Sequence, residues 1–263
     1  MANQSVTWSI NSRNEVSLIY EGHQGPPISG EDRVIDISHS VSGMVFILLN
    51  HDGVPFLEYS DSIEHPQWAE VAVILPAGLH VHKIDAGPKN NTYLVLSDGT
   101  VGVISKPKEG QKSATPEILE GTEDTLEVSA GPDALVWVIA YDSSKGTVVR
   151  WFDPKGETWH TIDGIEHPRR ITGIAKGKAY IIDVNGKIIL IDKKGNTEVV
   201  SEEFAGDTKA SQISASEDGT LWLVVHGSLN SELVYISKDK GKNWTKIENA
   251  EAHHLDAGVL KNA

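Results

Sequence analysis

The stretch Gln212-Ile213-Ser214-Ala215-Ser216-Glu217-Asp218-Gly219-Thr220-Leu221-Trp222-Leu223-Val224 joins a short strand ending in small residues to a Gly turn and a Trp-bearing apolar strand. An aromatic residue inside such an apolar strand occurs six times along the 263 residues, at Trp8, Phe46, Tyr93, Trp137, Tyr180 and Trp222. Successive aromatics lie 38, 47, 44, 43 and 42 residues apart. A repeat of about 40–45 residues is typical of four-stranded propeller blades. The spacing therefore indicates a repeat protein.

Two further elements keep a nearly fixed distance from these aromatics. An apolar residue followed by small residues begins nine positions before the aromatic, at Ile84, Val128, Ile171 and Ile213. In the second repeat we take Ile35-Asp36-Ile37-Ser38, which begins eleven positions before Phe46, as the equivalent element. A third element starts 22 residues after the aromatic, at Trp68, Trp159 and Trp244. Each repeat is therefore interpreted as four short strands joined by Gly, Asp and Asn turns.

The two ends of the chain complement each other. The first repeat lacks its inner strand, whereas His254-Leu255-Asp256-Ala257-Gly258 is an additional one and nearly copies Lys83-Ile84-Asp85-Ala86-Gly87. A last strand that completes the first blade closes a ring and removes exposed sheet edges. The sequence therefore predicts an all-β fold, a six-bladed β-propeller of four-stranded antiparallel sheets closed by the C-terminal strand. One domain, 1–263, is expected, with blades at 5–29 plus 253–258, 33–75, 83–120, 126–164, 170–201 and 211–249.

Composition narrows the classes of function. Lys and Arg number 23 against 37 Asp and Glu, a formal net charge of −14, which repels phosphate backbones and anionic lipid. The absence of Cys excludes disulfides and thiolate metal sites. The N-terminus has no signal-peptide pattern, and the longest apolar run, 44–49, is too short for a membrane span. We expect no nucleic-acid partner, no membrane insertion and a cytoplasmic location, with secretion by a leaderless route as the alternative.

The last repeat resembles the tectonin family of β-propeller lectins. The resemblance is carried by the stretch 212–224, and by Trp244-Thr245-Lys246-Ile247 followed by residues 254–258. Phe46 and Tyr180 depart from the family pattern, which has Trp at these positions. The resemblance implies non-catalytic, multivalent recognition of glycans or glycoconjugates, with sites repeated around the ring and a role in defence.

A smaller motif, Ser237-Lys238-Asp239-Lys240-Gly241-Lys242-Asn243-Trp244, resembles the Asp-box hairpin of sialidases and other propellers. The resemblance implies that Asp239 caps the turn through backbone N–H groups, that Gly241 has a positive φ and that Trp244 packs beneath. Residues 153–159 are a looser version. The motif is structural and therefore implies no sialidase chemistry.

The candidate carbohydrate site combines an aromatic floor with neighbouring polar groups. Rings that face a crevice can stack on sugars, and burial between blades is the competing role for the same rings. The first candidate is the blade-six cluster of Asp218, Trp222, His226 and Asn230. The weaker equivalents are Trp137 with Tyr141, and Tyr93 with Asn91.

Other chemistry has less support in the sequence. His80 and His82 share one face of a strand, but no further ligand lies at a recognised spacing, so no metal and no cofactor are predicted. No Gly-x-Ser-x-Gly elbow, phosphate loop or dinucleotide fingerprint occurs, and no catalytic residue is predicted. A propeller hydrolase or lyase and a protein-interaction scaffold remain alternatives to the lectin. The oligomeric state is left open.

Overall fold

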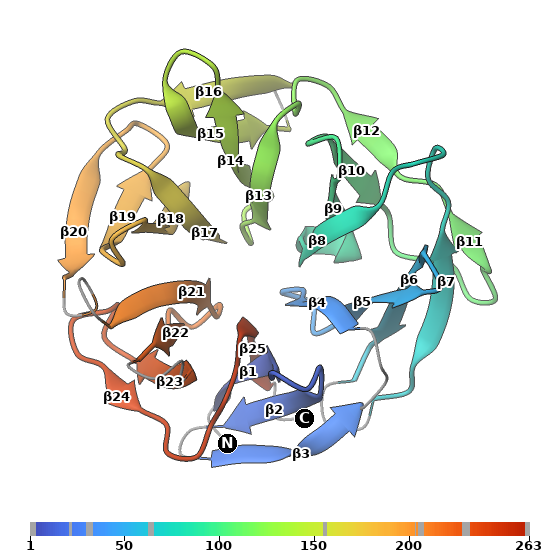
Figure 1. The fold of residues 1–263 in the computed structure, drawn as a ribbon, viewed down its shortest axis with the longest axis horizontal. Helices are drawn as coiled ribbons and strands as arrows, with labels where there is room; N and C mark the ends of the chain where they lie inside the picture. The colour runs from blue at the N-terminus through green and yellow to red at the C-terminus, as the bar shows by residue number, and fades with distance from the viewer. Residues whose placement is uncertain are drawn as a thin grey trace.

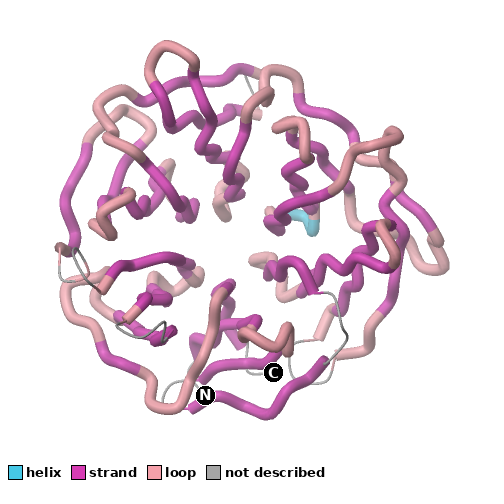
Figure 2. Tube along the Cα trace, viewed as in Figure 1, coloured by secondary structure: helices cyan, strands magenta, loops and turns pink. Residues whose placement is uncertain are grey.

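The computed structural model describes residues 4–20, 23–29, 34–62, 66–154, 157–202, 204, 208–227 and 232–260. They form six sheets around a central axis, and the one helical element in these ranges is the short 3-10 turn η1 (Pro88–Asn90). Figures 1 and 2 show the closed ring and the loops that join its strands. The predicted six-bladed β-propeller is confirmed. Among the described residues, no helix has the length and apolar character to cross a membrane.

Each blade runs from an inner strand beside the axis to an outer strand at the rim (Figure 1). Blade 1 contains β25 (His254–Leu260), β1 (Gln4–Ile10), β2 (Val16–Tyr20) and β3 (His23–Ser29). Blade 2 contains β4 (Val34–His39), β5 (Val45–His51), β6 (Val54–Ser60), β7 (Ala69–Val73) and β11 (Ser113–Ala114). Blade 3 contains β8 (Val81–Ala86), β9 (Thr92–Leu96), β10 (Val101–Ile104) and β12 (Glu117–Leu119).

The other three blades follow the same order. Blade 4 contains β13 (Thr125–Ala130), β14 (Val136–Asp142), β15 (Gly146–Asp153) and β16 (Thr158–Ile162). Blade 5 contains β17 (Pro168–Ile174), β18 (Lys178–Asp183), β19 (Ile188–Asp192) and β20 (Thr197–Ser201). Blade 6 contains β21 (Lys209–Ala215), β22 (Leu221–His226), β23 (Glu232–Ser237) and β24 (Thr245–Lys246).

The ring closes through the C-terminal strand, as predicted. β25 pairs antiparallel with β1 over seven residue pairs, from Gln4 opposite Leu260 to Ile10 opposite His254. Trp8 lies opposite Asp256 in this register. Because β25 pairs along its whole length, it covers the edge of β1 that would otherwise be unpaired.

Blade 2 differs from the expected four strands, because β11 from the third repeat joins it. β11 pairs in parallel with β7, and the N–H groups of Ala72 and Ile74 donate to the carbonyls of Lys112 and Ala114 at 3.0 and 2.8 Å. The outer edge of blade 2 would otherwise expose a row of backbone polar groups. The long β10–β12 connection therefore covers an edge.

The sheet registers show which residues are equivalent in the six blades. A polar residue of the inner strand lies opposite the aromatic of the second strand in every blade: Asp256 and Trp8, Ser38 and Phe46, Asp85 and Tyr93, Ser129 and Trp137, Thr172 and Tyr180, Ser214 and Trp222. In the second repeat Ile37, and not Ile35, is therefore the equivalent of Ile84. The assumed eleven-residue offset was wrong by two positions, because the alternation in Ile35-Asp36-Ile37-Ser38 fits either choice.

The strand aromatics fill the interfaces between neighbouring blades. The side chains of Trp8, Phe46, Trp137 and Trp222 are fully buried. Trp222 of blade 6 packs against Ile19 and Leu255 of blade 1. Burial of a large aromatic stabilises the fold, and its truncation to Ala costs about 3–5 kcal/mol. These rings therefore hold the blades together.

The outer Trp residues pack against aromatics of the same region. Trp159 lies 5.1 Å from Phe152 and Trp244 lies 5.7 Å from Phe204, measured between ring centroids. The Asp-box turn has the geometry that its resemblance implies: Asp239 Oδ1 accepts the Asn243 N–H at 2.9 Å, and Gly241 has a φ of 87°. Hydrogen bonds from the Asn243 side chain, the Asn243 N–H and the Ser237 hydroxyl lower the pKa of Asp239 to about 2. Part of the looser copy at 153–159 lies outside the described residues.

Candidate functional site

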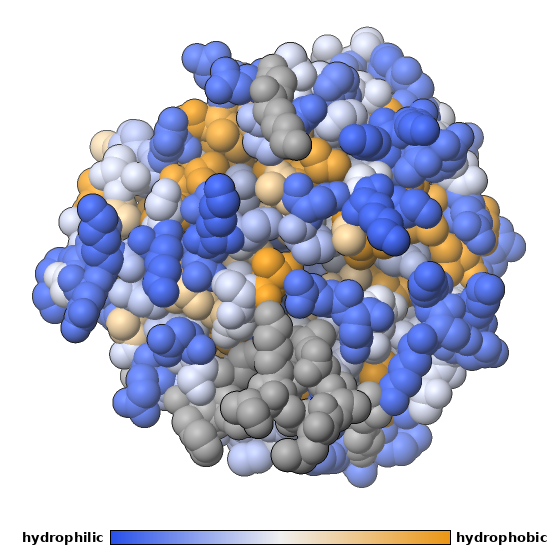
Figure 3. Space-filling model, turned by 180° about the vertical axis from the view of Figure 1, so that it is seen from behind, coloured by the Kyte–Doolittle hydropathy of each residue, from blue (hydrophilic) through white to orange (hydrophobic). Residues whose placement is uncertain are grey.

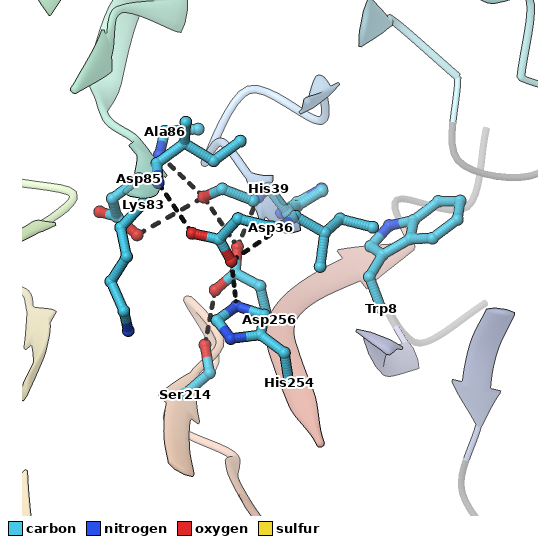
Figure 4. A network of polar contacts seen from close by, with 12 residues as sticks. Trp8, Asp36, His39, Lys83, Asp85, Ala86, Ser214, His254 and Asp256 are labelled. Carbon is cyan, nitrogen blue, oxygen red and sulfur yellow. Dashed lines mark hydrogen bonds and ion pairs between the residues drawn. The ribbon is translucent and has the colours of Figure 1, made fainter. Parts of the chain in front are cut away.

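A belt of hydrogen bonds joins the inner strands around the central axis. In five of the six steps, the polar residue opposite the aromatic accepts a hydrogen bond from a backbone N–H of the next inner strand. The pairs are Ser38 with Ala86 at 2.8 Å, Asp85 with Ala130 at 2.5 Å, Ser129 with Gly173 at 2.9 Å, Ser214 with Ala257 at 2.9 Å, and Asp256 with His39. Figure 4 shows the part of this belt around Asp256. The belt ties each blade to the next by a side chain.

The belt is interrupted at one step, between blades 5 and 6. Thr172 of β17 is the sixth member, yet its hydroxyl makes no hydrogen bond within the part of the chain that the structure describes. The residue is 7% exposed. The adjoining inner strand β21 therefore receives no side-chain hydrogen bond from Thr172.

A second polar layer lies two residues earlier on each inner strand. It consists of Asp36, Lys83, Glu127, Arg170, Gln212 and His254, which surround a small space of about 40 Å³. Glu127 binds Lys83 at 2.6 Å and Arg170 at 2.7 Å, and His254 Nε2 lies 2.8 Å from Asp36 (Figure 4). Lys83 and Arg170 share the one carboxylate of Glu127, so this group of three keeps one net positive charge next to the belt.

Two belt carboxyl groups have no such cationic partner in direct contact. Asp85 and Asp256 both contact the hydroxyl of Ser38, at 3.4 and 3.0 Å (Figure 4). Burial, and next the charge of Asp256, hold the pKa of Asp85 well above its usual range. Burial raises the pKa of Asp256 to about 6, although the hydroxyl of Ser214 lowers it. By contrast, burial acts to raise the pKa of Asp36, but His254, Lys83 and the Ile84 N–H together lower it below its usual range.

A cavity of about 690 Å³ begins at these two carboxyl groups. It opens on the face that carries the turns between the first and second strands of the blades, and it extends into the crevice between blades 5 and 6. In that crevice its wall includes the apolar side chains of Tyr180, Leu190, Val200 and Leu221. Seen from behind, the molecule shows apolar side chains between hydrophilic ones near the centre of the ring (Figure 3).

Charged side chains surround the mouth of the cavity. The basic ones are Lys176, Lys178, Lys240 and Lys242, and the acidic ones are Glu198, Glu217 and Asp218. Lys240 and Lys242 are exposed and lie on the Asp-box turn, whose backbone is fixed by Asp239. The cavity therefore combines a mouth that carries both lysines and carboxylates, an apolar crevice between blades 5 and 6, and an inner end with two carboxyl groups.

The structure does not bring the predicted blade-six cluster together. Asp218 caps the turn before β22, where its Oδ1 accepts hydrogen bonds from Ser216 at 2.7 Å and from the Thr220 N–H at 2.9 Å. His226 ends β22, and a strand of six residues spans roughly 20 Å. Trp222 lies between them, fully buried, with Nε1 donating to Ser5 at 3.1 Å. Asn230 lies outside the described residues.

The two weaker groups behave differently. Trp137 is fully buried, whereas Tyr141, four residues along β14, is 52% exposed, so the two rings do not form one floor. Tyr93 and Asn91 are close neighbours at the start of β9, and Tyr93 is partly buried. Burial, and next the charge of Asp85, raise the pKa of Tyr93. Only this last pair has an aromatic ring and a polar group side by side.

Sequence reasoning missed the carboxyl pair and Thr172. The signal was present, because these residues occupy the small polar position of the inner strand. Aligned on the aromatics, that position is Ser or Thr in four repeats and Asp in two.

No group of three or more His, Asp or Glu side chains within the described ranges is arranged to hold a metal ion.

Comparisons with known proteins agree on the fold class. No known protein family matches the sequence, and no curated protein matches it. Solved structures that resemble it include a TolB-like protein from Agrobacterium tumefaciens, at 12% identity and a TM-score of 0.63 over 94% of this chain and 89% of that one. A protein of unknown function from Bacteroides caccae has 10% identity and a TM-score of 0.62, over 99% and 100% of the two chains.

A third similar structure is a complex. YCF48 bound to D1 peptide has 13% identity and a TM-score of 0.55, over 92% of this chain and 77% of that one. At these identities the likeness establishes the fold, a β-propeller, and nothing about the ligand. None of the three structures named here is a tectonin lectin.

Proposed function

We propose that this β-propeller is a non-catalytic binding module that takes an extended segment of a partner protein into the cavity between blades 5 and 6. The observation that carries the proposal is the cavity itself, at the one interrupted step of the belt. Its volume of about 690 Å³ lies within the range of ligand pockets, roughly 300–1,000 Å³. The apolar crevice fits apolar side chains, and the exposed Lys240 and Lys242 on the Asp-box turn fit acidic ones.

The comparison with YCF48 supports this class of ligand. That protein shares the fold and has been solved with a peptide.

A cytoplasmic location remains a prediction from the sequence.

Carbohydrate binding of the tectonin type is the second candidate function. The observation that favours it is the pairing of Tyr93 with Asn91, a ring beside an amide. The full burial of Trp137 and Trp222 leaves those two rings without an exposed face for a sugar.

The experiment is a direct comparison of the two ligand classes. The purified protein is applied to an array of random peptides and to a glycan array, and the affinity of each positive ligand is then measured by calorimetry. We expect peptides rich in Asp or Glu and in apolar residues to bind. The variant Lys240→Glu/Lys242→Glu should weaken this binding by about tenfold or more, because two attractive charges become repulsive.

The matched control is Lys106→Glu/Lys108→Glu, which changes two exposed lysines with the same spacing in blade 3. This control should bind the same peptides as the unmodified protein does. Equal affinity of the two double variants would place the peptide elsewhere and contradict the proposal. Binding to glycans alone would establish the second candidate instead.

A further inference from the structure

The inner end of the cavity has a threefold pattern of acceptors. Around the axis the belt residues follow in the order Asp256, Ser38, Asp85, Ser129, Thr172 and Ser214. Asp256, Asp85 and Thr172 therefore occupy alternate positions, separated by the three serines. All three line the cavity.

Thr172 supplies the observation that points to a ligand. Its side chain is more than nine-tenths buried, lines both the cavity and the small space below it, and makes no hydrogen bond within the described residues. The Thr172 residue lines the cavity, so its hydroxyl is accessible to a ligand there. An incoming donor would complete the one belt position that the chain leaves open.

Charge specifies what that donor is. The carboxyl groups of Asp85 and Asp256 contact one common hydroxyl, that of Ser38, so the two groups lie close together. The cations of the adjacent layer contact other carboxyl groups: Lys83 and Arg170 share Glu127, and His254 contacts Asp36. Two neighbouring buried carboxyl groups resist joint ionisation unless a positive charge is supplied, which agrees with the raised pKa of both.

We propose that Asp256, Asp85 and Thr172 form a subsite for an ammonium group. An alkylammonium has three N–H donors around one axis and carries the missing charge, so it matches three acceptors at alternate positions of the ring. The inference rests on the proposed function in one respect: the ammonium belongs to the segment bound in the cavity, either as a lysine side chain or as the N-terminal amine. A multivalent metal ion fits less well, because two carboxyl groups are the only anionic ligands.

A small probe tests the subsite without a peptide. Butylammonium, a mimic of the lysine side chain, is titrated into the protein at neutral pH, with butanol as the uncharged control and calcium chloride as the inorganic cation. Binding is followed by NMR of protein labelled with ¹³C at the Asp carboxyl carbons, in which Asp85 and Asp256 are assigned by substitution. We expect butylammonium to shift both resonances in a saturable manner and butanol to shift neither.

Two conservative variants separate binding from folding. Asp256→Asn retains an oxygen that can accept the His39 N–H, and Thr172→Val removes a hydroxyl on which no belt hydrogen bond depends. We expect Asp256→Asn to weaken butylammonium by about tenfold or more, and Thr172→Val by about two- to tenfold. Asp192→Asn, at an exposed turn of blade 5, should leave the affinity unchanged.

The proposal is overturned if butylammonium produces no saturable shift, if Asp256→Asn binds it as the unmodified protein does, or if calcium produces the same shifts at lower concentration. Peptides from the array then identify the source of the amine. Loss of affinity on replacing Lys by norleucine assigns a lysine, and loss on N-terminal acetylation assigns the terminus.

The two proposals fail separately. Peptides that bind with equal affinity after both modifications would contradict the ammonium subsite and leave the proposed function standing. Saturable binding of butylammonium by a protein that binds no peptide would support the subsite and contradict the proposed function.

Discussion

Ser5 connects the indole of Trp222 to the seam of the ring. It accepts the Trp222 Nε1–H at 3.1 Å and lies 2.9 Å from the hydroxyl of Ser216. The corresponding indole N–H groups of Trp8 and Trp137 are buried without a partner. Ser5 lies three residues before the strand aromatic of blade 1, the blade that follows Trp222 around the ring. In blades 2 and 5, which follow Trp8 and Trp137, the same position is Gly43 and Gly177, which offer no hydroxyl.

We therefore expect Ser5→Ala to lower the free energy of unfolding by about 1–3 kcal/mol, because a third buried N–H loses its acceptor. Urea denaturation followed by fluorescence measures the change. Ser105→Ala, at an exposed loop position, should stay within about 0.5 kcal/mol of the unmodified protein. Equal midpoints for the two variants would show that the hydrogen bond contributes nothing.

Asp256 makes stability depend on pH in an unusual direction. Burial raises its pKa to about 6 in the folded protein, against about 3.9 for an unfolded Asp. The folded state therefore holds the proton more tightly, and this residue's contribution to stability falls as pH rises from about 4 to about 6, by about 3 kcal/mol in total. Asp85, which contacts the same Ser38 hydroxyl, and His254 are the titratable groups that face Asp256.

The expected result is that Asp256→Asn gains stability relative to the unmodified protein across that pH window. Denaturation midpoints measured at a series of pH values give the difference directly. A difference that stays constant between pH 4 and 6, or one that grows in the opposite direction, would show that Asp256 is ionised in the folded protein with an ordinary pKa.

Strand β11 belongs to the third repeat but pairs with the outer strand of blade 2. Ala114→Pro removes a backbone N–H from the parallel pairing with β7, so β11 should detach while the other four strands of blade 2 remain. Hydrogen exchange at the Ala72 and Ile74 amides, which donate to β11, should accelerate by about tenfold or more. Lys112→Ala, which keeps the backbone groups, should leave both rates unchanged, and unchanged rates in Ala114→Pro would mean that this edge is protected in another way.

The repeat spacing was enough to predict the strands and their grouping into blades. The candidate lectin site depended in addition on whether the strand aromatics are exposed to solvent. Leu221-Trp222-Leu223-Val224-Val225 is an uninterrupted apolar run, which is typical of a strand covered on both faces. In this fold a neighbouring blade covers each face, and Trp222 is fully buried as a result. Polar and apolar residues do not alternate in this run, and that was the sign in the sequence that neither face of the strand is open to solvent.

The position of β11 and the gap at Thr172 were beyond sequence reasoning for a different reason. Each depends on a contact between two particular blades that the other pairs of neighbouring blades do not make. Thr172 differs from Ser129 and Ser214 by one methyl group, and its sequence context is ordinary. Whether its hydroxyl meets the next inner strand depends on how blades 5 and 6 approach each other, which no pattern within one repeat encodes.

Closure by β25 places several separate contacts in one short strand. β25 buries Leu255 and Ala257 against blade 6, supplies Asp256 to the belt, and places His254 against Asp36. It also pairs with β1 along its whole length. The net free energy of unfolding of an ordinary domain is only about 5–15 kcal/mol, so the loss of several such contacts at once removes a large part of it.

A chain that ends at Ala252 should therefore lose cooperative unfolding, because β1 loses its inner pairing partner and the inner strands of blade 6 lose the contacts that they make with β25. Circular dichroism during thermal denaturation tests this expectation. A synthetic peptide of residues 253–260 added in trans should restore the transition, since the ring needs the strand and not the covalent link. A peptide with the same composition in scrambled order should fail to do so, because Trp8 must meet Asp256 in register. A shortened chain that unfolds cooperatively at the midpoint of the full one would mean that the ring is held by its inter-blade aromatics alone.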